Sequence, residues 1–183
     1  MAEEHGDRLT IDELIANVVF LFSAGHQTTR DLIGNGLLAL LRTPEVKRRV
    51  ASDPARLPAL VEECLRYDPS VTATARKARE DTAIAGTAIA AGDQVVLSIS
   101  AANRDPARFP DPDRFDIDRP DNEPLAFGGG IHYCLGAALA RAEAQIVFGT
   151  LLRRYPTLEL AEPAVRWRDT WIFRGPVALR VWL

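Results

Sequence analysis

The first forty residues carry apolar side chains at helical spacing. After Thr10 and Glu13, which have the spacing of a capping box, apolar positions recur every three or four residues from 11 to 40, and the pattern stops before Pro44. A stripe of this length predicts a single helix of about 32 residues, roughly 48 Å long. Such a helix would cross a whole domain.

Two shorter helices are predicted next. Thr43 as N-cap and Pro44 at the first helical position predict a helix that ends near Val50. Apolar positions on one side of residues 58 to 67 predict a third helix, which Pro69 ends. Helices therefore dominate the first third of the chain.

The pattern then changes to short β-prone runs. Residues 71 to 98 alternate such runs with Gly86 and Gly92, which predicts a small sheet of hairpins. The segment 104 to 124 is rich in proline and charge, yet it contains apolar anchors and is predicted to be an ordered loop. After it come a glycine-rich segment, a last helix that ends near Tyr155, and short strands. The predicted fold class is mainly α with small β-sheets (α+β).

Composition limits the possible function classes. The 183 residues are 47% hydrophobic and 26% charged, as in a soluble globular domain. A net charge of −3 provides no overall basic field, so neither a nucleic-acid nor a membrane partner is expected. No apolar stretch reaches the roughly twenty residues that span a bilayer. The acidic, polar N-terminus is unlike a secretory signal, so we expect a cytoplasmic location.

One of the two cysteines lies in a setting that suits metal binding. Cys134 belongs to FGGGIHYCLG, a glycine-rich run directly before the last predicted helix. The positive end of a helix favours thiolate, and glycines let the backbone approach a flat partner closely. For an arbitrary cysteine a buried structural role is the commoner one. Here the spacing of the surrounding residues favours a metal-binding cysteine over a structural one.

This run resembles the FGxGxHxCxG signature of the haem-thiolate monooxygenases called cytochrome P-450. The resemblance implies that Cys134 is the axial ligand of haem iron, with haem b as cofactor. It also implies that His132 hydrogen-bonds a haem propionate and that the ring of Phe127 shields the sulfur. The remaining cofactor-binding positions implied by the signature are Gly128, Gly130 and Gly136.

A second segment, AGHQTT at residues 24 to 29, resembles the oxygen-binding motif of the same family. Gly25 removes a side chain where a large ligand lies against the helix, and Thr28 can bond back to a carbonyl and kink the turn. The resemblance implies that Thr28, with an acid just before it, delivers protons. Gln27 stands at that acid's position, and an amide can position water but cannot ionise. Alone, the segment would be read as an ordinary stretch of core helix.

Three further positions follow from the resemblance. Glu63 and Arg66 lie three residues apart on one helix face, and the family has a buried pair of this kind that contacts an arginine before the cysteine loop. Arg108 and Arg114 are the candidates for that arginine, and Arg114 is favoured by its place in PDRF. Arg76 matches a second propionate-binding position.

The substrate pocket is expected to be apolar. The resemblance places it between the long helix, the stretch after the third helix and a turn near the C-terminus. The residues assigned to it are Phe22, Ala24, Val71, Thr72, Ile172 and Phe173.

These motifs follow the family order from about Leu9 to the C-terminus, but family members are about twice as long. Residues 1–183 are therefore expected to be the C-terminal half of a cytochrome P-450 catalytic domain, a single and incomplete domain. The implied function is insertion of one oxygen atom of O2 into an apolar small molecule, with NAD(P)H-derived electrons supplied through a ferredoxin or flavoprotein reductase.

Two other functions remain open. The chain could be a truncated, inactive fragment or a haem-binding module without turnover, which Gln27 and the missing half favour. A cysteine hydrolase built on Cys134 and His132 is disfavoured, because two residues on one glycine loop can hardly align as nucleophile and base.

Overall fold

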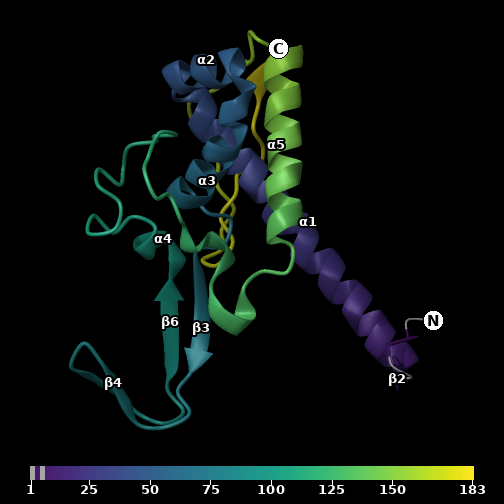
Figure 1. Ribbon diagram of the computed structural model, residues 1–183, viewed down its shortest axis with the longest axis vertical. Coiled ribbons are helices and arrows are strands. Elements are labelled where there is room, and N and C mark those ends of the chain that lie inside the picture. Colours follow the sequence, from purple (N-terminus) through teal and green to yellow (C-terminus); the bar gives the residue numbers. More distant parts are fainter. Residues whose placement is uncertain (1–2, 5–6) are drawn as a thin grey trace.

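A single long helix is the first and the longest helix that the structure describes. The computed structural model describes residues 3–4 and 7–183, and in it α1 runs from Ile11 to Leu41 (Figure 1). The predicted capping box is present: the Thr10 hydroxyl accepts from the Glu13 amide at 3.3 Å, and the Glu13 carboxylate accepts from the Thr10 amide at 2.8 Å. Before the helix, β1 (Glu3–Glu4) pairs antiparallel with β2 (Asp7–Arg8). The predicted long helix is confirmed.

The two halves of α1 have different surroundings. Figure 1 shows the N-terminal half extending away from the rest of the fold. Apolar side chains that face solvent cover this half, whereas most residues from Thr29 onward are buried or half-buried. The exposed large apolar residues of this half are Ile11, Leu14, Ile15, Val18, Val19, Phe20, Leu21 and Phe22, and Leu9 just before the helix is exposed as well.

Three helices pack around the C-terminal half of α1. They are α2 (Pro44–Ser52), α3 (Leu57–Tyr67), which follows the short 3-10 turn η1 (Pro54–Arg56), and α5 (Ala137–Arg154). Buried apolar residues from all four helices form one core. At Gly36 of α1 an added Cβ would lie 2.7 Å from both Cys64 and Phe148, so only glycine permits this approach.

Cys64 and Thr43 lie at different places in this helical packing. Cys64 is buried in it, and burial raises the pKa of the Cys64 thiol well above its usual value. Thr43 is the N-cap residue of α2, as predicted, and its carbonyl accepts from the Lys47 amide at 3.1 Å. Its side chain does not cap α2, because the hydroxyl donates to the Ala39 carbonyl at 2.9 Å instead.

Small antiparallel sheets flank the helices. Strand β3 (Ala73–Lys77) pairs with β6 (Gln94–Ser98), and β4 (Thr82–Ile84) forms a hairpin with β5 (Thr87–Ile89). The two-residue hairpin turn has positive φ at Ala85 and Gly86, as type I′ turns require. Near the C-terminus β7 (Glu159–Leu160) pairs with β8 (Val181–Trp182). The predicted hairpins and the predicted strands of the tail are confirmed.

A long ordered loop leads to the cysteine segment. After α4 (Ile99–Ala102) the chain has no regular element until the short 3-10 turns η2 (Leu125–Phe127) and η3 (Gly130–His132). The predicted anchors Phe109, Phe115 and Ile117 are buried. None of the helices that the structure describes is long and apolar enough to cross a membrane.

Candidate functional site

The cysteine loop places Cys134 three residues before α5. Gly128 and Gly130 have φ values of 70° and 64°, a region that residues with a Cβ rarely adopt. The Cys134 amide donates to the Phe127 carbonyl at 3.0 Å, and the Cys134 carbonyl accepts from the Ala137 amide at 3.2 Å. The loop is thus closed on itself, and the Cys134 side chain is exposed.

A cavity of about 760 Å³ lies in front of this loop. Ala24 and Thr28 of α1 and the segment 74–77 of β3 line it together with the cysteine loop. The size is within the range of ligand pockets, about 300–1,000 Å³. Of the residues singled out in the sequence, the cavity brings together Ala24, Thr28, Val71, Arg76, Phe127, Gly128, His132, Cys134 and Phe173.

Phe22 does not line this cavity, so its assignment to the substrate pocket is wrong. At 100° per residue, positions 22 and 24 of a helix point in nearly opposite directions. Phe22 is 70% exposed, and its ring stacks on His26 with 5.6 Å between the centroids.

Thr72 is a second misassigned pocket residue. Its hydroxyl donates to the Trp171 carbonyl at 2.5 Å and to the Ile172 carbonyl at 3.0 Å, and it lines a different hollow, among arginines. Neighbouring residues of an extended segment face opposite sides, so Val71 enters the cavity and Thr72 does not. Ile172 also lies outside the cavity lining, whereas Phe173 belongs to it.

The oxygen-motif segment is an uninterrupted part of α1. The Thr28 hydroxyl donates to the Ala24 carbonyl at 2.6 Å, which is the back-bond that the sequence predicts. The helix continues through Gly25 without interruption. Gly25 and Gln27 lie outside the cavity lining, and an added Cβ at Gly25 would meet nothing within 4 Å.

Basic side chains line the cavity near the cysteine loop. Arg76 donates to the Thr74 hydroxyl at 3.2 Å and to the Ala75 carbonyl at 2.8 Å, and no carboxylate of the described residues pairs with it. The imidazole of His132 has no hydrogen-bond partner within the described part of the chain. Lys77 lines the same cavity. These groups are available to bind anions.

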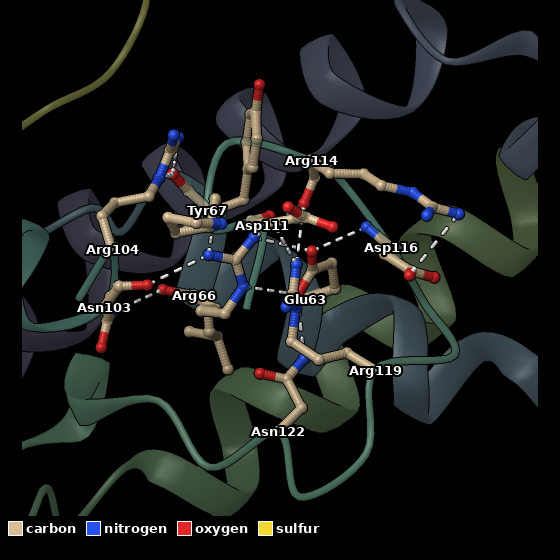
Figure 2. Close-up of polar contacts among 12 residues, drawn as sticks. Glu63, Arg66, Tyr67, Asn103, Arg104, Asp111, Arg114, Asp116, Arg119 and Asn122 are labelled. Atoms are coloured by element: carbon tan, nitrogen blue, oxygen red, sulfur yellow. Dashed lines mark hydrogen bonds and ion pairs between the residues drawn. The ribbon is translucent and has the colours of Figure 1, made fainter. Parts of the chain in front are cut away.

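A buried charge network joins α3 to the long loop (Figure 2). Glu63 and Arg66 are both 0% exposed and form two parallel hydrogen bonds of 2.8 Å. Arg66 also donates to the carbonyls of Asn103, Pro112 and Arg114 at 2.8–3.0 Å. All five N–H groups of the guanidinium are therefore used, as a buried arginine requires.

The third charge of this network is Arg119, and the prediction of Arg114 is wrong. The Arg119 side chain is 6% exposed, and its Nε lies 3.6 Å from Oε2 of Glu63. The Arg114 side chain is 69% exposed and lies 3.7 Å from Asp116, so only its carbonyl joins the network. Figure 2 shows the Arg119 side chain beside Glu63 and that of Arg114 directed toward Asp116.

Sequence reasoning missed two asparagines of this region. Asn122 donates to Glu63 at 3.0 Å. Asn103, fully buried, donates to the Leu65 carbonyl at 3.3 Å and accepts from the Leu125 amide at 2.8 Å, which links α3 to the start of the cysteine loop. Isolated asparagines in a charged loop give no pattern from which such roles can be predicted.

Comparison with known proteins establishes the family. The model described as Cytochrome P450 matches residues 1–168, so the chain belongs to the cytochrome P450 family. Cytochrome P450 107B1 of Saccharopolyspora erythraea is 48% identical over 177 residues, which cover 95% of this chain and 44% of that protein. The biotin biosynthesis cytochrome P450 of Bacillus subtilis is 48% identical over 169 residues, covering 92% of this chain and 43% of the relative.

Solved structures confirm the predicted fold class. Cytochrome P450 PksS of Bacillus subtilis matches with a TM-score of 0.94 and 42% identity, over 98% of this chain and 47% of that one. P450BioI, in complex with a hexadec-9Z-enoic acid ligated acyl carrier protein, matches with a TM-score of 0.92 and 47% identity, over 96% and 46%. The chain thus spans less than half the length of these relatives.

The residues present fit the haem cofactor that family membership implies. A haem-thiolate site needs a cysteine sulfur as iron ligand, a flat open surface and partners for the two haem carboxylates. Cys134 is exposed, and an added Cβ at Gly129 or Gly130 would meet nothing within 4 Å, so the face of the loop is open. Arg76 and His132 line the same cavity without acidic partners among the described residues.

Proposed function

We propose that residues 1–183 form the C-terminal half of the catalytic domain of a haem-thiolate monooxygenase, a single and incomplete domain. The observation that supports this most directly is that Cys134 lines one cavity together with Ala24 and Thr28 of α1. A sulfur that can bind a metal and a helix that can contact a small molecule thus face the same cavity. In this proposal Cys134 would hold haem b, which when bound would supply dioxygen activation for insertion of one oxygen atom into an apolar substrate.

Residues of the cysteine loop and of β3 have separate parts in this proposal. The sulfur of Cys134 binds iron, and the half-buried ring of Phe127 limits access of water to that sulfur. His132 and Arg76 would hold the haem carboxylates, and Lys77 lines the same cavity as a further cation. Gly128, Gly130 and Gly136 keep the loop backbone close to the flat cofactor.

Thr28 would hold a water molecule at the distal wall. Its hydroxyl proton is directed to the Ala24 carbonyl, so the oxygen lone pairs are free to accept from water in the cavity. Gln27 cannot ionise, and any proton that reaches Thr28 must therefore come through water. Gly25 leaves room beside this turn.

An apolar substrate fits the remaining lining. Ala24, Val71, Ile99 and Phe173 contribute small or apolar side chains to the cavity. The fatty-acyl chain held by P450BioI has this chemistry. Electrons from NAD(P)H through a ferredoxin or flavoprotein reductase, and a cytoplasmic location without nucleic-acid or membrane partners, complete the proposal.

The test is haem reconstitution followed by a reduced carbon monoxide difference spectrum. The wild-type chain should show a thiolate-type Soret band, and Cys134→Ala should abolish it. Cys64→Ser provides the matched control, because Cys64 is buried in the helical core away from the cavity. Absence of the band in the wild type, or its survival in Cys134→Ala, would refute iron ligation by Cys134.

A second candidate is a haem-binding module without turnover, or an inactive truncated chain. The exposed apolar half of α1 and the amide of Gln27 favour it. Consumption of NAD(P)H that depends on substrate and yields a hydroxylated product would exclude this candidate, whereas haem binding without such consumption would support it.

A further inference from the structure

We propose that Arg141 of α5, together with Glu62 of α3, is a positioning residue that holds the cysteine loop in the conformation in which Cys134 binds iron. This inference rests on the proposed haem ligation. It assigns a role to two side chains that the sequence signature of the loop does not include.

Arg141 contacts α3 and the cysteine loop at once. Its Nε and one terminal nitrogen donate to the two carboxylate oxygens of Glu62 at 2.5 and 3.1 Å. Its other terminal nitrogen donates to the Tyr133 hydroxyl at 3.1 Å. The guanidinium carbon lies 4.6 Å from the centroid of the Phe127 ring, within the range of a cation–π contact.

These contacts reach Cys134 from both sides of the loop. Tyr133 is the residue directly before Cys134, and the Phe127 carbonyl accepts the Cys134 amide proton at 3.0 Å. The rings of Phe127 and Tyr133 also meet edge to face at 6.5 Å. A guanidinium that holds both rings therefore restricts the two residues that orient the Cys134 backbone. These are Tyr133, to which Cys134 is bonded, and Phe127, whose carbonyl accepts from the Cys134 amide.

The chemistry of arginine suits this task. Hydrogen bonds to Glu62 raise the pKa of Arg141 above its already high value, so the side chain is cationic at all physiological pH values. Its planar fork can pair with a carboxylate on one edge, donate to a hydroxyl on another and lie over a ring. Lysine offers one charged atom and cannot make these contacts together.

The experiment compares Arg141→Lys, Glu62→Gln and Tyr133→Phe with the wild type. Arg154→Lys serves as the control, because Arg154 lies on the same helix and near a ring, 5.8 Å from the Tyr155 centroid, but at the far end from the loop. Tyr133→Phe removes one exposed hydroxyl and keeps the ring, so it should fold even if the arginine variant does not.

The first readout is amide hydrogen exchange of the haem-free chain. We expect exchange at Tyr133 and Cys134 to accelerate about tenfold in Arg141→Lys and less in Tyr133→Phe, with no change in the core of α3. The second readout is the lifetime of the thiolate-type Soret band of the reconstituted carbon monoxide complex, which should shorten in the same order. Arg154→Lys should change neither.

Unchanged loop exchange in Arg141→Lys and Tyr133→Phe would overturn the inference, as would faster exchange spread equally over all helices. The two proposals can fail separately. If the loop exchange changes as expected but the wild type shows no thiolate-type band, the positioning role stands and iron ligation by Cys134 is refuted.

Discussion

Replacing Arg119 and Arg114 in turn by methionine tests which arginine belongs to the buried network. Both substitutions remove one positive charge and keep an aliphatic side chain of similar length, so each is the other's control. Arg119 lies 3.6 Å from the fully buried carboxylate of Glu63, whereas Arg114 lies 3.7 Å from the half-buried Asp116 at the surface.

The expected loss at Arg119 follows from its partners. Besides the ion pair with Glu63, Arg119 donates to the carbonyls of Pro110, Asp111 and Arg114. Hydrogen bonds to charged groups contribute about 1.5–3 kcal/mol each, but water can reach part of this loop in the variant. Glu63 keeps Arg66 in Arg119→Met, so the loss is expected to be about 2–4 kcal/mol, below that of removing a buried partner entirely.

The loss at Arg114 should be smaller. An exposed pair at this distance contributes at most about 1 kcal/mol, and the Arg114 carbonyl that binds Arg66 is retained in the variant. The free energy of unfolding of small domains falls by about 1–3 kcal/mol per molar urea. The urea concentration at the unfolding midpoint should therefore fall by roughly 1–2 M in Arg119→Met. In Arg114→Met it should fall by less than about half as much. Equal shifts, or a larger one for Arg114→Met, would refute the assignment of Arg119.

Three other predictions concern the loop, the helix and the acid response. Gly130→Ala should weaken haem binding about tenfold in a haem titration, because Gly130 has φ of 64°, whereas Gly129→Ala, at φ of −163°, should not. Gln27→Glu should raise the yield of product per NAD(P)H several-fold, roughly three- to tenfold, if protons limit the reaction, and an unchanged yield would contradict a proton role at position 27. The hydrogen bond from Arg49 lowers the pKa of Asp118, so its contribution to stability is present above the unfolded pKa of about 4 and is lost as pH falls through the folded value. When the pH is lowered from about 4 to 2, the urea midpoint of unfolding should accordingly decrease less in Asp118→Asn than in the wild type.

Local signals account for what the sequence predicted well. The helix from Ile11 to Leu41 has a capping box, a long apolar stripe and a proline beyond its end, and each of these signals consists of residues at most four positions apart. The cysteine loop is likewise defined by glycines whose positive φ values no other residue tolerates easily. Where neighbours in sequence decide the conformation, spacing is enough to predict it.

Long-range contacts account for what was missed. Arg108, Arg114 and Arg119 lie in one charged segment, and only the path of the loop over α3 determines which of them reaches Glu63. Phe22 is apolar and near the oxygen motif, but the phase of the helix turns it away from the cavity. Thr72 is likewise turned outward by the extended backbone beside Val71.

The exposed half of α1 leads directly into the turn that contributes Ala24 and Thr28 to the cavity. Most helical stability in proteins comes from the packing of an apolar face, and the apolar side chains of the turns before residue 23 are exposed, so contact with another polypeptide would stabilise these turns. The Ala24–Thr28 turn stands where this uncovered stretch meets the packed half of the helix. A polypeptide that covers the first stretch and a ligand that fills the cavity would both stabilise this turn. Their binding free energies should therefore be coupled, each raising the affinity for the other.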